Sequence, residues 1–119
     1  MGKDIQTEYG SIIISRDVIA NLAGMATMGC VGVVGVVAAR LTDGISELLR
    51  GESLAKGVEV IVDRENRLII RVNVVVGYGN RINVIATNIM ENVKYTVEKL
   101  TGLTVDHVEV NVQGVRIID

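Results

Sequence analysis

Two residues, His107 and Cys30, are the chain's only histidine and only cysteine, and they are its first candidates for catalysis or metal binding. A zinc site needs three or four His, Cys, Asp or Glu ligands, and no cluster with ligand spacing includes His107. Alternating apolar neighbours place His107 on the solvent face of a strand. Cys30 lies in an apolar run, where burial disfavours the reactive thiolate. The sequence therefore favours a surface histidine and an inert cysteine over a nucleophile–base pair, and predicts no catalytic residue, metal or cofactor.

Three glycines, Gly29, Gly32 and Gly35, recur at every third position. The spacing is neither the dinucleotide fingerprint nor the P-loop. Gly29 to Gly32 formally matches the G-x-x-G loop of KH domains, which clamps a nucleic-acid backbone, but Cys30 and Val31 offer a phosphate little. The net charge of −2, the pI of about 5.4 and the scattered basic residues also argue against nucleic acid as a partner. Close packing of chain segments is the favoured explanation of these glycines.

Length and composition predict one domain, residues 1–119, with an aliphatic core. Hydrophobic residues make up 49% of the chain and aromatic residues only 3%. The single cysteine favours a reducing, cytoplasmic setting, and the polar N-terminus lacks the pattern of a signal peptide. Between Asp17 and Arg40 lies a stretch of transmembrane length that carries no charge. Its Asn21, Thr27 and four glycines favour a soluble helix followed by an extended segment, so no transmembrane segment is expected.

Hydrophobic periodicity predicts an α+β fold, a two-layer sandwich in which helices cover one face of a mixed β-sheet of about three to four strands. Ser15 is the expected N-cap of a first helix that ends near Gly29. The predicted elements that follow are a short strand or extended crossing segment at 31–37, a helix at 38–49 and a loop at 50–53. After them come a hairpin at 58–76 with its turn at 63–66, a helix from about Asn80 or Asn83 to Leu100, and a last strand around 108–112. The strand–helix–strand unit near the C-terminus implies a parallel crossover, so the sheet is expected to be mixed.

The outer sheet face is the predicted site of contact with partners. Alternation places charged and aliphatic side chains on it together: Glu59, Ile61, Ile69, Arg71, Val75 and Glu109. The opposite charges could form cross-strand pairs, which is the purely structural explanation. The exposed aliphatic residues among them are typical of a weak interface.

The chain resembles the alkaline shock protein family, also called the envelope stress response family, of Gram-positive bacteria. The resemblance covers almost the whole chain and rests on motifs in order: Tyr9-Gly10-Ser11-Ile12, Ile14-Ser15, Val18-Ile19, Ala23-Gly24, Gly32-Val33-Val34-Gly35, Asp43-Gly44-Ile45-Ser46-Glu47-Leu48-Leu49, Lys56-Gly57-Val58, Val76-Gly77-Tyr78-Gly79, Asn92-Val93-Lys94-Tyr95 and Val112-Gln113-Gly114-Val115. The last two, with Cys30, are most similar to a small single-domain branch. This chain departs from the family at Thr27-Met28-Gly29, where members often carry an acidic residue.

The resemblance implies a non-enzymatic, cytoplasmic protein linked to envelope stress, in some members membrane-associated through a separate anchor protein. It transfers no site residues. The leading hypothesis is an adaptor or scaffold that binds other proteins, such as a membrane anchor or a lipid-metabolism protein, and that forms homo-oligomers. The alternative is a regulator that binds a small apolar ligand such as an acyl chain. KH-like nucleic-acid binding comes third.

Overall fold

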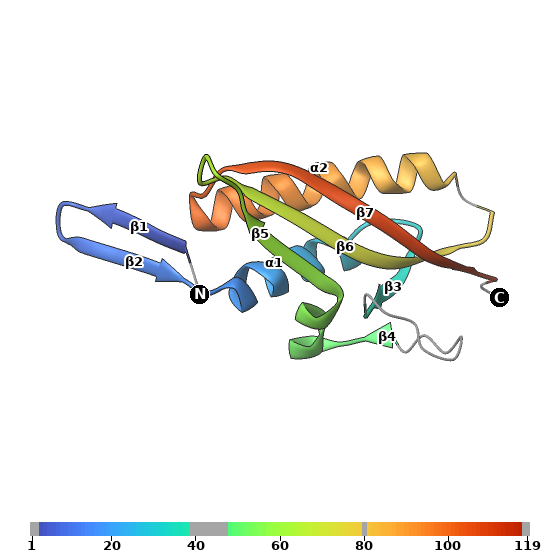
Figure 1. Ribbon diagram of the computed structural model, residues 1–119. Helices are drawn as coiled ribbons and strands as arrows, with labels where there is room; N and C mark the ends of the chain where they lie inside the picture. Colours follow the sequence, from blue (N-terminus) through green and yellow to red (C-terminus); the bar gives the residue numbers. More distant parts are fainter. Residues whose placement is uncertain (1–2, 39–47, 80, 118–119) are drawn as a thin grey trace.

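A mixed sheet covered by two helices forms the body of the protein, and a separate hairpin extends from it at the N-terminal end (Figure 1). The computed structural model describes residues 3–38, 48–79 and 81–117. The elements are β1 (Lys3–Thr7), β2 (Gly10–Ile14), α1 (Arg16–Met28), β3 (Val33–Val37), β4 (Leu48–Leu49), the 3-10 helix η1 (Gly51–Gly57), β5 (Val58–Val62), β6 (Leu68–Gly77), α2 (Ile82–Thr101) and β7 (Val105–Arg116). The predicted α+β class is confirmed.

Strand β6 is the central strand of the main sheet. β7 runs parallel to it along its whole length, and β5 and β3 pair with it in antiparallel fashion. Because β5 pairs with the first half of β6 and β3 with the second half, the two share the other edge of β6 end to end. The short β4 then pairs with β3. Among the described residues the main sheet therefore has five strands, one more than the upper end of the prediction, because β4 lies where a helix was predicted.

The predicted hairpin and parallel crossover are confirmed. The β5–β6 turn is held by Asp63, whose carboxylate accepts backbone N–H bonds from Glu65 at 2.9 Å and Arg67 at 2.8 Å. Asn66 in this turn has a φ of 68°, which Asn tolerates better than most residues. α2 connects β6 to β7 and ends at Gly102 in the left-handed conformation. This connection sets β7 beside β6 and aligns the outward side chains of the two strands.

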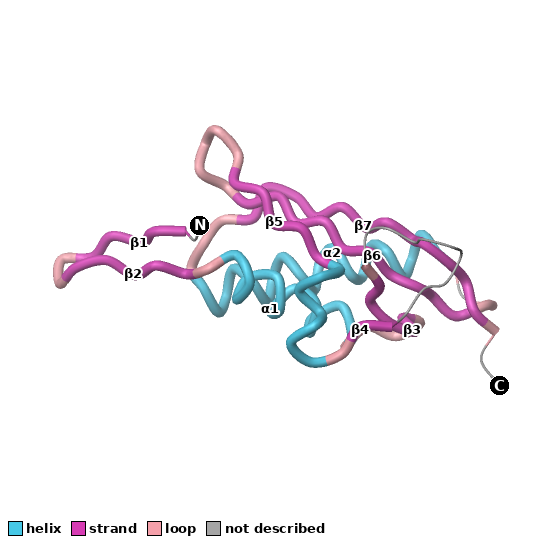
Figure 2. The backbone as a smooth tube through the Cα atoms, turned by 60° about the horizontal axis from the view of Figure 1, so that its bottom comes forward, coloured by secondary structure: helices cyan, strands magenta, loops and turns pink. Residues whose placement is uncertain are grey.

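The aliphatic core lies between the sheet and the two helices, which lie on the same side of it (Figure 2). The inward residues of β6, including Ile70, Val72 and Val74, are fully buried. Ser15 caps α1 by accepting the Val18 N–H at 3.2 Å, as predicted. Gly24 lets η1 approach α1, because a Cβ at this position would lie 2.9 Å from the Leu54 Cβ. The apolar alternation of the sequence thus marks the buried face of the sheet.

The segment between β3 and β5 differs in part from its prediction. Most of the helix predicted at 38–49 falls on residues 39–47, which lie outside the described residues, but its last two residues are wrong because they form strand β4. The loop predicted at 50–53 is wrong from Gly51 onward, where η1 begins. Leu48 packs close to β3, since a Cβ on Gly35 would lie 2.8 Å from its Cδ2. This tertiary contact overrides the local helical pattern.

The sequence marks Tyr9 to Ile14 as β-prone, in agreement with β2, but strand β1 and the hairpin that it forms with β2 were not predicted. β1 and β2 pair with each other as a separate two-stranded sheet, and most of β2 is exposed. Ile5 and Ile14 touch the core, whereas the side chain of Ile13 is 69% exposed. The polar composition of residues 1–9 gave no alternation from which a first strand could be predicted. As for membrane crossing, the helices among the described residues all fall short of the length and apolar character that a span requires.

Candidate partner-binding face

One row of three residues forms the centre of the outer sheet face. Sheet register sets Glu59 of β5 and Glu109 of β7 on either side of Arg71 on β6. The Arg71 guanidinium donates to both carboxylates, from Nη1 to Glu59 Oε1 at 3.0 Å and from Nε to Glu109 Oε1 at 3.3 Å. The three side chains are 41–59% exposed, so the row is open to solvent. The structure thus brings together three of the predicted face residues.

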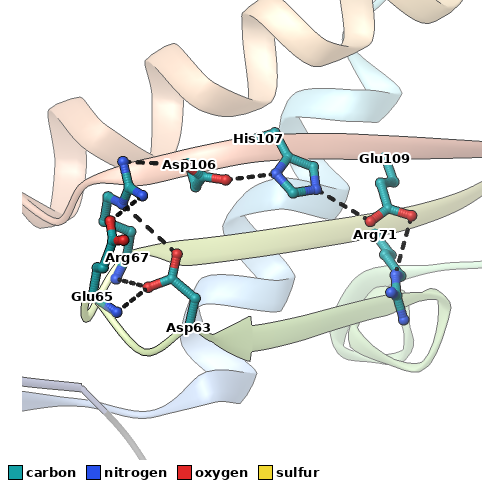
Figure 3. A network of polar contacts seen from close by, with 7 residues as sticks. All are labelled: Asp63, Glu65, Arg67, Arg71, Asp106, His107 and Glu109. Atoms are coloured by element: carbon teal, nitrogen blue, oxygen red, sulfur yellow. Dashed lines mark hydrogen bonds and ion pairs between the residues drawn. The ribbon is translucent and has the colours of Figure 1, made fainter.

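A chain of ion pairs continues from this row toward the β5–β6 turn (Figure 3). His107 lies between two carboxylates, with Nε2 at 3.3 Å from Glu109 Oε2 and Nδ1 at 2.7 Å from Asp106 Oδ2. Arg67 Nη1 then lies 3.2 Å from Asp106 Oδ1. Arg67 also pairs with two residues of the turn, Glu65 and Asp63. We call the whole set the outer-face network: Glu59, Asp63, Glu65, Arg67, Arg71, Asp106, His107 and Glu109.

The contacts of the outer-face network stabilise the charged forms of its titratable side chains. The pKa of His107 is raised, first by its hydrogen bond to Asp106 and then by that to Glu109. The pKa values of Asp106 and Glu109 are lowered, in both cases chiefly by the hydrogen bond from His107. The pKa of Arg71 is raised, chiefly by its hydrogen bond to Glu59. Because a histidine ring can donate from both nitrogens only when protonated, the geometry around His107 suits the imidazolium.

Beside the network, three amide side chains meet on the same face. Asn73 is only 4% exposed and donates from Nδ2 to the Gly57 carbonyl at 3.1 Å. Its Oδ1 accepts from Asn111 at 3.3 Å and from Gln113 at 3.2 Å. With the central row, these amides line an open hollow of about 580 Å³. The hollow offers hydrogen-bonding groups in fixed positions rather than an apolar cavity.

The aliphatic residues predicted on this face differ in accessibility. Ile61 and Ile69 are half-buried and remain part of the surface. Val75 is only 1% exposed, so the prediction that it contributes to an exposed face is wrong. Gly35 and Gly114 flank Val75 on the neighbouring strands, and Leu48 lies over Gly35, where a Cβ would be 2.8 Å from the Leu48 Cδ2. The exposed part of the face is therefore more polar than the sequence indicated.

The importance of Asp106 and His107 was missed from the sequence. Strict alternation would put the two side chains on opposite faces of the sheet. The register of β7 against β6 instead skips Asp106, so that Leu68 pairs with Val105 and Ile69 with His107. This bulge lets adjacent side chains join one network. A single sequence contains no clear signal for such a skip.

The other chemical candidates are not brought together. Cys30 packs against the core on the helical side of the sheet, where its Sγ donates to the Ala26 carbonyl at 3.5 Å. His107 lies on the outer face, so the two do not form a nucleophile–base pair. Gly29 ends α1, and Gly32 has a φ of 92° in the turn before β3. The two glycines therefore serve the turn and do not form a phosphate-binding loop. Within residues 3–38, 48–79 and 81–117, no group of three or more His, Cys, Asp or Glu side chains could hold a metal ion.

A second hollow, of about 480 Å³, lies between α1 and η1 and is lined mainly by apolar groups. Its lining residues are Asn21, Met25, Gly51 and Leu54. The Asn21 Oδ1 atom is buried without a hydrogen-bond partner among the described residues. Of the hollows described here, this one comes nearest to the apolar site that an acyl chain would require.

Comparison with known proteins places this chain among envelope-related proteins. The model of the alkaline shock protein family, described as having a cell envelope-related function, matches residues 4–117. A Bacillus subtilis (strain 168) protein named "Uncharacterized protein YloU" is 42% identical over 118 residues, which cover 98% of each chain. A Streptococcus pyogenes serotype M6 protein named "Uncharacterized protein Spy1614" is 37% identical over 115 residues, covering 96% of this chain and 94% of that protein. No solved structure gives a significant match.

Proposed function

The chain belongs to the alkaline shock protein family, whose function is cell envelope-related, and on this premise we propose that it is a non-enzymatic adaptor that binds a partner protein through its outer sheet face. The observation that carries the proposal is the outer-face network. It fixes charged side chains in place on an open surface, beside half-buried Ile61 and Ile69. Polar groups held in fixed positions around a little apolar surface are typical of interfaces that bind selectively.

The charge of the face indicates the partner's chemistry. The outer-face network contains five carboxylates against two guanidinium groups and one histidine. Carboxylates remain in excess when the exposed Arg64 of the same turn is counted. An acidic face attracts Lys- and Arg-rich segments and is repelled by anionic lipid. Because cytoplasmic loops next to membrane spans are rich in Lys and Arg, the proposed partner is the basic juxtamembrane segment of an envelope protein.

In this proposal the protein works in the cytoplasm and reaches the membrane through its partner. The small-ligand alternative has less support, because the hollow beside Met25 and Leu54 is open and the hollow on the outer face is lined by charged and amide groups. A carrier of acyl chains would need a deeper apolar site. Native mass spectrometry after gentle extraction tests this alternative, which requires a co-purifying lipid mass.

The test of the adaptor role is capture from membrane and soluble fractions of the native host. The variant Glu59→Gln/Glu109→Gln removes two carboxylates without changing side-chain size. It should lower recovery of the membrane partner about tenfold, since close charge pairs at interfaces contribute strongly to selective binding. Glu91→Gln on the exposed side of α2 is the matched control and should capture normally. The same variants should rank identically in binding a synthetic Lys/Arg-rich peptide, with binding that weakens as salt rises.

Normal capture by the double carboxylate variant, with unchanged circular dichroism, would reject the outer face as the binding site. A lysine at Val75 is not a usable probe of this face, because burying a charge there would unfold the sheet. A conservative surface change is required to separate binding from stability.

A further inference from the structure

The hollow of about 580 Å³ on the outer face lies where two strands meet one edge of β6. We call it the outer-face hollow. β5 pairs with β6 as far as Val72, and β3 pairs with it at Val74 and beyond, so Asn73 lies at the junction of the two. On that edge Asn73 meets the Gly57 carbonyl at the end of η1. The junction therefore places a buried amide, only 4% exposed, in the lining of an open hollow.

Asn73 sets the orientation of the two other amides that line the outer-face hollow. A backbone carbonyl only accepts hydrogen bonds, so the Asn73 atom that faces Gly57 is its nitrogen and the Oδ1 atom faces β7. Asn111 and Gln113 must then turn their NH₂ groups toward this oxygen, at 3.3 and 3.2 Å. Their own carbonyl oxygens receive no hydrogen bond from any residue that the structure describes. The hollow therefore offers two fixed amide oxygens as unused acceptors.

The carboxylates beside these amides also have room for another donor. Glu59 accepts from Arg71 through Oε1, and within the described part of the chain no group donates to its Oε2. Glu109 accepts from Arg71 through Oε1 and lies against His107 through Oε2. An ionised carboxylate has about four lone-pair sites, so neither group is saturated. With two carboxylates and one guanidinium in its lining, the outer-face hollow combines excess negative charge with unused oxygen acceptors.

We propose that the outer-face hollow binds the guanidinium group of an arginine side chain, supplied by the basic segment of the partner. This inference rests on the adaptor function proposed above and names the residue type that the site selects. A guanidinium is a planar cation with five N–H donors and no acceptor, so it can donate in several directions to oxygens of Glu59, Asn111 and Gln113. A lysine ammonium carries its three donors at one point and is more strongly hydrated. The hollow should therefore prefer arginine to lysine.

Arg71 shows that this surface already accommodates one guanidinium. Its group lies between Glu59 and Glu109, with donor–acceptor distances of 3.0 and 3.3 Å. The two carboxylates outweigh its single charge, so a second cation is attracted to the hollow, whereas an anion would face both carboxylates. The charge balance therefore favours a guanidinium over a phosphate or carboxylate ligand.

Two synthetic peptides of equal length and charge test the preference, one with all its basic residues as arginine and the other with all of them as lysine. In isothermal titration calorimetry at one salt concentration, the full-length protein should bind the arginine peptide about tenfold more tightly. Asn111→Ala and, separately, Gln113→Ala each remove an acceptor and should bring the arginine peptide close to the affinity of the lysine peptide. Asn88→Ala, on the exposed side of α2, is the matched control and should keep the preference. Circular dichroism checks that each variant is folded.

NMR titration of ¹⁵N-labelled protein identifies the ligand at the hollow. The arginine peptide should shift the side-chain amide signals of Asn111 and Gln113, and free L-arginine should do so only at much higher concentration. Free L-arginine that binds as tightly as the peptide would overturn a partner segment as the source of the guanidinium. Inorganic phosphate that shifts these signals, where the arginine peptide does not, would show an anion site and overturn the proposal.

The outcomes separate this proposal from the adaptor role. Equal affinity for the two peptides, with both lost in Glu59→Gln/Glu109→Gln, would overturn the arginine site and leave the adaptor role standing. An arginine preference that survives both Asn111→Ala and Gln113→Ala would overturn the hollow as its location. A protein that binds neither peptide would overturn both proposals.

Discussion

The N-terminal hairpin and the outer face of the main sheet are both exposed β-surfaces, but their charges are arranged in opposite ways. On the outer face, Arg71 contacts Glu59 and Glu109, and His107 contacts Asp106 and the same Glu109. On the hairpin, strand β2 carries no charge, and Glu8 in the adjoining turn has no ion-pair partner among the described residues. The charges of the outer face are paired within one chain, with carboxylates in excess, whereas strand β2 has no charged side chain to pair.

The two surfaces also differ in their support. The outer face lies on strands whose inner residues are fully buried, such as Ile70 and Val72. The hairpin touches the core only through partly buried residues, including Ile5 and Ile14. A rigid surface keeps its polar groups in position for a selective partner. The hairpin has less of this support, because most of β2 is exposed.

The largest expected difference between the two regions is in amide hydrogen exchange. At low protein concentration the amides of β2 should exchange at least about a thousandfold faster than those of central β6, because local opening of the hairpin costs far less than global unfolding. Hydrogen exchange followed by NMR or mass spectrometry measures both. Equal protection of β2 and β6 in dilute protein would contradict the comparison.

A substitution at Asn73 tests how much the buried amide contributes to holding the outer face in shape. The variant Asn73→Val leaves the buried Gly57 carbonyl without its side-chain donor and removes the acceptor for Asn111 and Gln113. It should lower the free energy of unfolding by about 2 kcal/mol, the cost of unsatisfied buried polar groups. Urea unfolding measures this loss.

The matched control for that variant is Asn111→Ala, on the same face but exposed. It should change the free energy of unfolding by less than about 0.5 kcal/mol. A loss as large as that of Asn73→Val would mean that the amide cluster acts as one unit rather than being held by its buried member. Either result would show how the hollow is kept in shape.

Sequence patterns predicted the body of the protein far better than its margins. The β5–β6 hairpin could be predicted from the alternation along Leu68–Val76 and from the turn at Asp63–Asn66, because burial of one face imposes a two-residue period. The predicted α2 and the parallel β7 followed from strong helical periodicity. β1 escaped prediction because its residues contact little beyond β2, so no burial pattern marks them. β4 and η1 depend on tertiary contacts that local propensity does not reveal.

The candidate site was predictable in part for the same reason. Alternation placed Glu59, Arg71 and Glu109 on one face of the sheet, and the register of the structure sets them in one row. The bulge at Asp106 and the burial of Val75 were not predictable, because both depend on how neighbouring strands approach β6 and β7. Alternation tells which face a side chain is on, but not whether that face is covered.

The smallest expected effect concerns His107 and pH. Its pKa in the folded protein is raised, so the stability it contributes is fully present below its unfolded pKa of about 6.5 and is lost as pH rises through the folded pKa. The pKa values of Asp106 and Glu109 are lowered, so their contribution is present above about pH 4.3 and is lost as pH falls through their folded values. The network should therefore be strongest between about pH 5 and 6, where both conditions hold.

Thermal unfolding between pH 6 and 8 checks this expectation. The Tm of the wild type should fall by only about 2 °C across this range, because solvent-exposed ion pairs contribute little. His107→Asn should flatten the decline, and high salt should reduce the difference between the two proteins. Since the hairpin contains no histidine, the Glu8→Arg variant should keep the wild-type pH slope. A slope that survives in His107→Asn would mean that another group titrates, and that His107 does not link the two halves of the outer-face network.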